Sequence, residues 1–426
     1  MEPPTAGLTY APDGRRYPLM ERSAYLYPVN PSPPAPGSQA SLREANRLRV
    51  LDALREQGAM TQVEIAGSTG LSPATVSNMV KELDGAGAVE LAPSIRNGRR
   101  AVLVSLATGN TLLAGIAFGD RDVRVAIATG PRDIVGRHRM PLPASHNADE
   151  GMERAARLLY DLVDKSGKTM ADVKAVGVGV PAPVDSVTGQ VGSESILPGW
   201  RGVDVGAEMR ARLGAPVVID NTANLGALGE LRCGALQGVS DGAFIKLSYG
   251  VGAGLVLGGE VFRGSAGTAG EIGHLTIDEN GPICRCGNRG CLETFIGSPA
   301  LTDALAGSHG RLTLRDIIAN ALEGDVGCRR VLEDAGRHLG VAVAGLVNLL
   351  NPEVVVVGGQ LAQVGDIILD PMRRALERSA IPSATASLVV RRSELLTGAD
   401  VIGAVVAAET LHAASEGHLV TIASTS

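Results

Sequence analysis

Residues 269–293 read AGEIGHLTIDENGPICRCGNRGCLE. They bring one imidazole and three thiols together at the spacing H-x9-C-x-C-x4-C, in the residues His274, Cys284, Cys286 and Cys291. Nitrogen and sulfur ligands gathered in one short loop are typical of a closed, tetrahedral Zn²⁺ site, which leaves no coordination position open for catalysis. We therefore predict a structural zinc ion, held by a loop over residues 274–293.

The distribution of cysteines supports this interpretation. Of the 5 cysteines in 426 residues, three lie in this loop, which argues against the alternative that they are ordinary buried thiols. Metal-type spacing without a disulfide framework indicates a reducing compartment, so we expect a cytoplasmic protein. Glu271 and Glu293 flank the predicted ligands, an arrangement suited to fixing a pocket for a polar ligand.

Length and composition narrow the class of protein. A chain of 426 residues is too long for one hydrophobic core and indicates two or three domains. The 55 glycines and the aromatic content of only 3% fit an α/β protein with many glycine-bearing turns. A net charge of −6 argues against a wholly basic nucleic-acid binder but leaves a local basic patch possible. We expect neither a membrane span nor a secretion signal.

The texture of the sequence divides the chain into four parts. We predict a disordered, proline-rich tail over residues 1–40, because this stretch lacks apolar periodicity. A helix-rich unit follows over residues 41–106, then an α/β domain over residues 108–414 and a C-terminal tail over residues 415–426.

Residues 41–106 predict a winged helix-turn-helix. Apolar residues at helical spacing over 45–54 indicate a first helix, the capping box Thr61–Glu64 begins a second, and Ser72-Pro73 begins a third. Residues 89–91 and 101–104 can pair as a hairpin with a basic tip. In a winged helix the third helix enters the major groove while the hairpin lies on the backbone and minor groove. The residues predicted to contact DNA are Ser72, Thr75, Ser77, Asn78 and Lys81 of the third helix and Arg96, Arg99 and Arg100 of the hairpin tip.

A purely structural three-helix bundle remains the alternative for this unit.

Beyond residue 108, apolar strand patterns alternate with glycine-bearing turns and helical stretches, as in α/β folds. The expected strands are residues 112–116, 123–127, 173–180, 216–220, 243–247, 253–257 and 354–357, and the expected helices end at residue 231 or span residues 366–379 and 401–413.

Taken together, these motifs resemble the ROK family (repressors, open reading frames, kinases), and in particular its regulators with an N-terminal winged helix. The resemblance spans about residues 42–413 and rests mainly on Ala269–His274 and on the run C-x-C-G-x-x-G-C-L-E. Asn351-Pro352 with Gly358-Gly359, and Leu197–Trp200, are supporting matches. The resemblance implies a two-lobed, actin-like sugar-kinase fold, with a sugar in the cleft between the lobes.

The resemblance also assigns roles to residues. It gives the four loop ligands to zinc and implies that sugar hydroxyls are held by Asn221, Glu271, His274 and Glu293. Carboxylates and an amide are well suited to satisfying several hydroxyls at once. The implied partners are operator DNA and a sugar or sugar-phosphate effector. A homodimer or homotetramer is expected, because paired recognition helices match paired half-sites.

The departures from the family pattern fall on the nucleotide side. The kinases carry an Asp-x-Gly-x-Thr-type phosphate loop, where this chain has Ala117 in place of the leading Asp and Asp120 and Asp122 nearby, which would repel phosphates. The kinases place a general base in a Glu-Asn-Asp-type motif, where this chain has Asp220-Asn221-Thr222. A neutral hydroxyl is no base at ordinary pH, and losing general-base action costs about 10²–10⁴ in rate. We therefore expect no enzyme activity.

Three functions are compatible with these observations. The preferred one is a sugar-responsive transcriptional regulator of carbohydrate metabolism, most simply a repressor. The second is an ATP-dependent kinase for a hexose or N-acetylhexosamine with an appended DNA-binding head. The third is an interaction protein, in which a protein partner rather than a sugar releases the DNA.

Overall fold

The computed structural model describes residues 9–10, 16–17, 43, 46–47, 49–51, 53–54, 57–85, 88–96, 99–106, 111–143, 146–185, 188–192 and 197–415. The chain divides into two compact units, Val29–Thr111 and Leu112–Ser426, with Met1–Pro28 grouped with the second. Within the predicted disordered tail, the described residues form a short antiparallel pair, β1 (Thr9–Tyr10) and β2 (Arg16–Tyr17). The rest of that tail, and residues 416–426 at the C-terminus, lie outside the described residues.

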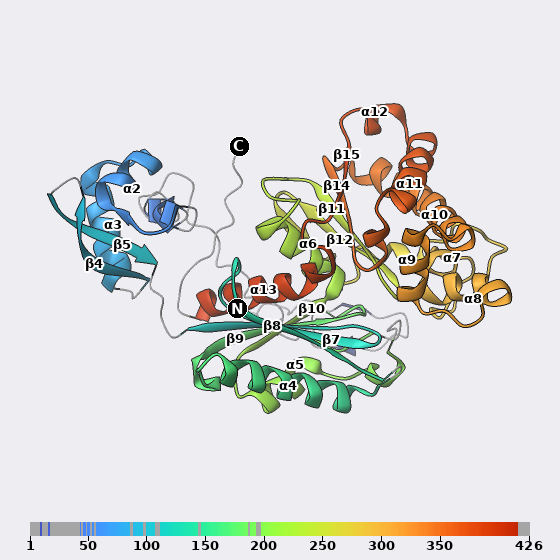
Figure 1. Ribbon diagram of the computed structural model, residues 1–426, viewed down its shortest axis with the longest axis horizontal. Helices are drawn as coiled ribbons and strands as arrows, with labels where there is room; N and C mark the ends of the chain where they lie inside the picture. Colours follow the sequence, from blue (N-terminus) through green and yellow to red (C-terminus); the bar gives the residue numbers. More distant parts are fainter. Residues whose placement is uncertain are drawn as a thin grey trace, which may run out of the picture. The chain divides into compact units, whose positions relative to one another are not determined.

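The first unit has the second and third predicted helices and the hairpin, whereas the predicted first helix over residues 45–54 lies partly outside the described residues. Its elements are β3 (Met60–Thr61), α2 (Gln62–Thr69), α3 (Pro73–Gly85), β4 (Val89–Arg96) and β5 (Arg99–Leu106), and its sheet has the order β3-β5-β4 (Figure 1). Both hydrogen bonds of the predicted capping box at the start of α2 are present. α2 continues to Thr69 and is capped by Gly70, whose φ of 69° a glycine adopts without strain.

The core of this unit is built on one face of α3. Val76, Met79, Val80 and Leu83 are buried at helical spacing on that face. They pack with apolar residues of the first helical segment, α2 and the hairpin, namely Val50, Ala53, Leu54, Met60, Ile65, Val89 and Val104. The opposite face of α3 is therefore left to solvent.

The second unit contains two sheets with the same strand order. The first comprises β6 (Leu112–Phe118), β7 (Asp122–Gly130), β8 (Asp133–Pro141), β9 (Val173–Val180) and β10 (Val217–Asn221), in the order β10-β9-β6-β7-β8. The second comprises β11 (Gly242–Leu247), β12 (Val251–Leu257), β13 (Glu260–Phe262), β14 (Val354–Gly358) and β15 (Val389–Arg392), in the order β13-β12-β11-β14-β15. In each sheet an antiparallel three-stranded meander is extended by two parallel strands. This duplication is the two-lobed architecture that the sequence predicted.

Helices cover both sheets and separate them. α4 (Ala148–Lys165) and α5 (Val205–Leu213) cover one face of the first sheet, while α13 (Ala399–Ser415) packs on its other face and against α6 (Thr222–Cys233), which in turn packs on β12 (Figure 1). Glycines allow the closest approaches. A Cβ at Gly177 would collide with the carbonyl of Ala404, and one at Gly403 with the carbonyl of Leu225. The two lobes therefore meet through tightly packed backbone.

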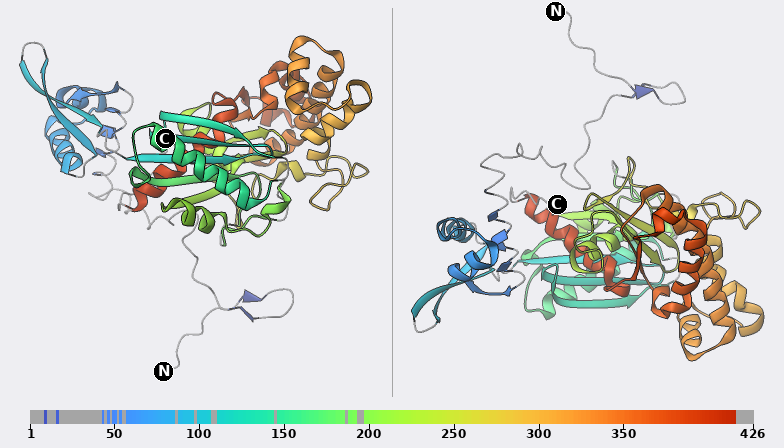
Figure 2. Two further views of the ribbon diagram at one scale, coloured as in Figure 1. Left: turned by 60° about the horizontal axis from the view of Figure 1, so that its bottom comes forward. Right: turned by 90° about the horizontal axis from the view of Figure 1, so that it is seen from above.

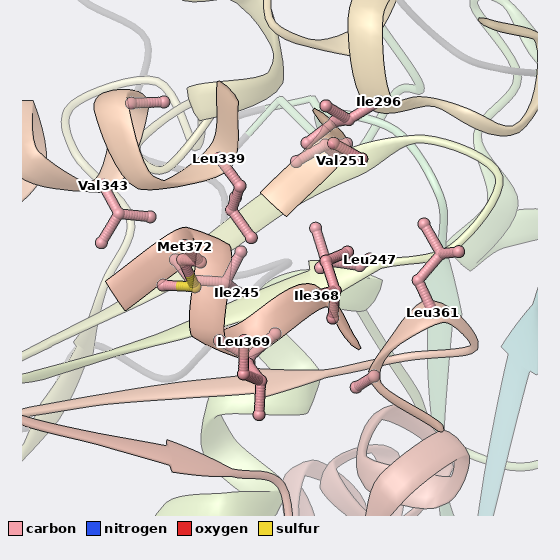
Figure 3. Close-up of a cluster of buried hydrophobic side chains, with 14 of the residues drawn as sticks. Ile245, Leu247, Val251, Ile296, Leu339, Val343, Leu361, Ile368, Leu369 and Met372 are labelled. Carbon is pink, nitrogen blue, oxygen red and sulfur yellow. The ribbon is translucent and has the colours of Figure 1, made fainter. Parts of the chain in front are cut away.

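The second lobe carries the additional helices. They are α7 (Glu293–Ile296), α8 (Ser298–His309), α9 (Leu314–Glu323), α10 (Val326–Leu350), α11 (Asp366–Ser379) and α12 (Pro382–Thr385). α10 and α11 lie side by side (Figure 2), and Leu339, Val343 and Met372 pack together beneath them with Ile245 of β11 (Figure 3). Short 3-10 turns complete the unit: η1 (Met170–Asp172), η2 (Pro198–Trp200), η3 (Ile272–His274), η4 (Leu361–Val364) and η5 (Leu396–Gly398). In the described part of the chain, no helix is both long and apolar enough to cross a membrane.

Candidate functional site

The four predicted metal ligands converge at one point. Their ligand atoms all lie within 4.8 Å of one another. His274 ends η3 and its Nδ1 lies 3.5 Å from Cys284 Sγ, while Cys286 Sγ lies 3.7 Å from Cys291 Sγ. The loop is held in place by backbone bridges between Thr276 and Cys291 and between its own two halves. His274 is thus brought next to cysteines that lie ten or more positions further along the chain, and the four residues form a cluster that could hold a metal ion.

Burial keeps the thiols of the cluster protonated unless a cation stabilises the thiolates. Burial raises the pKa of Cys284. Burial, followed by the neighbouring thiols, raises the pKa of Cys291 to about 12. Three thiols this close cannot all ionise at neutral pH unless a positive charge stabilises the thiolates, and a metal ion supplies that charge. The donor set is therefore compatible with a metal ion, which would take the place of the thiol protons.

His274 also connects the metal cluster to a carboxylate. Its Nε2, on the ring edge away from the cysteines, lies 3.9 Å from Glu271 Oε2. The other oxygen of Glu271 accepts a hydrogen bond of 3.2 Å from Asn221 Nδ2. Asn221 ends β10 and caps α6, where its Oδ1 accepts from the backbone N–H of Ala223 at 2.7 Å. Three of the residues predicted to hold sugar hydroxyls therefore form one chain of contacts.

The fourth, Glu293, lies on the first turn of α7 and is 8% exposed. Its carboxylate forms two contacts with the guanidinium of Arg285, at 2.7 and 2.8 Å, and accepts from the backbone N–H of Val251 at 3.2 Å. Arg285 lies between two of the cluster cysteines in sequence. The metal loop and the carboxylate are thus joined by a bidentate ion pair, the strong form of such a contact.

A cavity of about 1120 Å³ is lined by most of these side chains. Asn221, Glu271 and Glu293 line it, together with Thr222 and Arg285. His274 is not among the lining residues and reaches the cavity through Glu271. A volume of this size is typical of small-molecule sites, and its lining offers several hydrogen-bond acceptors at one end.

A network of charges also lines the cavity. Asp400, at the start of α13, contacts both Arg124 Nη1 of β7 and Lys246 Nζ of β11, each at 2.7 Å. Asp122 forms a short ion pair with Arg139 of β8 and lies 3.6 Å from Arg124 Nε. All five residues line the cavity. Asp122 is therefore neutralised by arginines and does not face the cavity as the bare anion expected from sequence.

Burial and pairing set the charge state of this network. Burial lowers the pKa of Lys246, because the ammonium loses its hydration, although Asp400 opposes the effect. Burial acts to raise the pKa of Asp400, but Arg124 and Lys246 outweigh it and hold the pKa below its ordinary value. Asp400 is therefore ionised at neutral pH.

The residues at which the resemblance predicts departures from the kinase motifs are buried. Thr222 begins α6, is 2% exposed and lines the cavity beside Asn221. Ala117 is fully buried in β6. The neighbouring acid Asp220 accepts from Asn224 Nδ2 at 2.9 Å and from Arg263 Nε at 2.9 Å.

In the first unit, the predicted DNA-contacting residues of α3 differ in exposure. Ser72, Asn78 and Lys81 are exposed, whereas Thr75 and Ser77 are half-buried. The hydroxyl of Ser72 also caps the helix, because it accepts from the backbone N–H of Thr75 at 3.2 Å. At the hairpin tip the backbone register pairs Arg96 with Arg99 and Ile95 with Arg100. The side chains of these arginines lie outside the described residues.

Sequence reasoning missed several residues of the cavity. Lys246 is a lone charge in a buried strand, and Asp400 begins a helix of small apolar residues. Arg285 stands between two metal ligands. A charge in an otherwise apolar element signals a buried partner, because an unpaired buried charge is costly, but the sequence does not say which partner.

The comparisons with known proteins agree with this architecture. Residues 113–410 match the ROK family. The chain belongs to the ROK family. Residues 44–100 match the MarR family, a second match that coincides with the winged helix.

Relatives include both regulators and kinases. A xylose repressor from Caldicellulosiruptor bescii is 31% identical over 389 residues, covering 87% of this chain and 96% of the repressor. A glucokinase from Halalkalibacterium halodurans is 32% identical over 309 residues, covering 68% of this chain and 92% of the enzyme. A solved ROK family transcriptional regulator, described as a homologue of the Escherichia coli MLC protein, superposes with a TM-score of 0.70 at 25% identity, covering 87% of this chain and 97% of that one. The regulators thus match both units of this ROK protein, whereas the kinase matches a smaller share.

Proposed function

We propose that this ROK protein is a DNA-binding transcriptional repressor whose second unit binds a sugar. The observation that carries the proposal is the combination of two units in one chain. One is a winged helix with an exposed polar face on α3. The other has a cavity where Asn221, Glu271 and Glu293 converge. Relatives that match 87% of the chain, and so extend over both units, are repressors or transcriptional regulators.

DNA recognition rests on α3 and the hairpin. The α3 residues Asn78 and Lys81 are exposed on the face opposite its buried stripe, where they can reach base edges and phosphates. Arg96, Arg99 and Arg100 lie at the hairpin tip in sequence, where they would neutralise phosphates or enter a narrow minor groove. Because operators are paired half-sites, a homodimer or homotetramer is the expected form.

The metal is proposed to be a structural zinc ion. Two thiolates at about 2.3 Å from a tetrahedral zinc ion are about 3.8 Å apart, and a thiolate and an imidazole nitrogen about 3.6 Å apart. The corresponding separations here are 3.7 Å for Cys286 and Cys291 and 3.5 Å for Cys284 and His274. The ion would use Nδ1 of His274 and leave Nε2 directed at Glu271. Zinc would thus fix both the imidazole and, through Arg285, the carboxylate of Glu293 for sugar binding.

Sugar kinase activity is the second candidate, favoured by the glucokinase relative. Against it, the resemblance aligns Thr222 with the general base of the kinases, and the neighbouring carboxylate of Asp220 is engaged by Asn224 and Arg263. A coupled ADP-release assay with hexoses and N-acetylhexosamines decides the question. Turnover at ordinary kinase rates of about 1–100 s⁻¹ would establish an enzyme.

DNA binding and its response to sugar are tested together by fluorescence anisotropy on the protein's own promoter region. We expect tight binding that weakens when one member of a sugar panel is added. Arg99→Ala should weaken binding about equally across DNA sequences and reduce the slope of log K against log salt by about 0.9, as for one lost phosphate contact. Glu90→Gln, at an exposed position of the same hairpin, is the matched control. Absence of binding to any promoter fragment at low salt would refute the DNA-binding role.

A further inference from the structure

The charge network that lines the cavity has a feature that the proposed function does not use. Asp400 holds Arg124 and Lys246, and Asp122 holds Arg139. Each carboxylate lies where cations from several elements converge, which is the surrounding that a bound phosphate requires. Here the chain itself supplies the anions.

The network also draws on both lobes. Arg124 belongs to β7 of the first sheet, Lys246 to β11 of the second, and Asp400 to α13 between them. All three side chains are largely buried, with exposures of 17%, 13% and 3%. A buried cation without its carboxylate is strongly unfavourable, so these pairs do not open readily to admit another anion.

Two further cations that line the cavity are also paired with carboxylates. Arg285 is engaged by Glu293, and Arg121 lies 3.3 Å from Asp120. A phosphate group placed here would meet cations that are already neutralised and would lie near the carboxylates of Glu271 and Glu293. Among the described lining residues, Arg311 and Arg315 are the cations with no ion pair found, but they are exposed around the start of α9, where water screens them.

We propose that Asp122 and Asp400 are internal anions that occupy the place of a ligand phosphate, so that the cavity accepts an uncharged sugar and rejects its phosphate ester. This inference rests on the proposed sugar-binding function and names the class of its effector. The hydroxyls of a neutral sugar suit the acceptors Asn221 and Glu271, whereas a phosphate dianion finds no buried cation without an ion pair among the described residues that line the cavity.

The first experiment compares matched ligand pairs on the full-length protein by isothermal titration calorimetry. The pairs are glucose with glucose 6-phosphate, N-acetylglucosamine with its 6-phosphate, and xylose with xylose 5-phosphate. We expect one free sugar to bind and its ester to bind at least about tenfold more weakly, because like charges oppose it. An ester that binds as tightly as the free sugar, or more tightly, overturns the inference. If no member of any pair binds, the sugar-binding function itself is refuted, and the inference with it.

The second experiment frees a cation. Asp122→Asn leaves Arg139, whose side chain is half-exposed, available to an anion, while the Arg124–Asp400–Lys246 contacts remain. Pyrophosphate should raise the thermal unfolding midpoint of this variant and leave the wild type unchanged. Asp303→Asn, at an exposed acid of the same cavity, is the control and should behave as the wild type. The internal-anion role is contradicted if the wild type binds pyrophosphate as tightly as the variant, or if a folded Asp122→Asn protein does not bind it. The fluorescence of Trp200 verifies that the variant is folded.

Discussion

Asp400→Asn is the substitution that tests the electrostatic core of the second unit most directly. The change keeps the shape of the side chain and removes the one carboxylate that contacts both Arg124 and Lys246. Two largely buried cations then face each other without the anion between them. The loss is therefore more than one hydrogen bond, because the desolvation of both cations is no longer offset.

The magnitude follows from the burial of the network. Removing one partner of a buried ion pair costs about 3–5 kcal/mol, a large share of the roughly 5–15 kcal/mol that stabilises a typical domain. Lys246→Met leaves the contact between Asp400 and Arg124 in place and should cost less than Asp400→Asn. The double variant removes one of the two cations that lose Asp400 as a partner. It should therefore be more stable than the sum of the single changes predicts, with a coupling of about 1–3 kcal/mol.

Urea unfolding followed by Trp200 fluorescence measures these values. Trp200 is the single tryptophan in the sequence. It is fully buried in the second unit and packs against Phe118, with ring centroids 4.6 Å apart. Its signal therefore reports on this unit alone. Glu153→Gln, which removes an exposed pair with Arg157 at 2.8 Å, is the control and should cost only about 0.3–0.5 kcal/mol. An Asp400→Asn protein that matches this control would show that the network does not stabilise the unit.

Three further predictions concern the metal, the packing of the lobes and acid stability. Cys284→Ser should lower the amount of bound metal measured by mass spectrometry and abolish the sugar response, while DNA binding stays intact. Cys233→Ser, at a cysteine outside the cluster, is the control and should change neither the metal content nor the sugar response. A Cys284→Ser protein that keeps both would refute the ligand assignment. Gly403→Ala should lower the unfolding free energy by about 1–3 kcal/mol or more, because the added Cβ meets the Leu225 carbonyl. Gly345→Ala is the control, because this exposed position of α10 has open space around it, and the change should be neutral or slightly stabilising. Equal changes in unfolding free energy for the two variants would contradict the packing argument. The backbone N–H of Cys328 and the side chain of His309 lower the pKa of Asp325 to about 2. The ionised carboxylate therefore stabilises the fold above its ordinary pKa of 3.8, and this stabilisation is lost as the pH falls through about 2. Asp325→Asn should flatten the acid limb of a plot of unfolding midpoint against pH, and an unchanged limb would refute the assignment.

Local patterns in the sequence determined much of the fold. β9 (Val173–Val180) and α11 (Asp366–Ser379) have the bounds that apolar periodicity and turn residues predicted. The capping box at Thr61 fixed the start of α2, because it satisfies backbone groups within four residues. β8 (Asp133–Pro141), α4 (Ala148–Lys165) and α10 (Val326–Leu350) were not predicted. β8 is an edge strand with several exposed charged residues, so it lacks the apolar alternation that marks a half-buried strand.

The metal cluster could be predicted from the sequence because its ligands are close together in the chain and their spacing is itself the restraint. The charge network could not, since Arg124, Lys246 and Asp400 come from β7, β11 and α13 and are separated by more than a hundred residues from one to the next. Nor could the sequence tell that Arg285 engages Glu293 or that Asp122 is neutralised by Arg139. Local spacing specifies contacts within a turn or a loop, whereas contacts between lobes depend on how two sheets and the helix between them pack. The sequence by itself therefore determined the kind of protein and its metal loop, and only the tertiary structure decided which charges meet in the cavity.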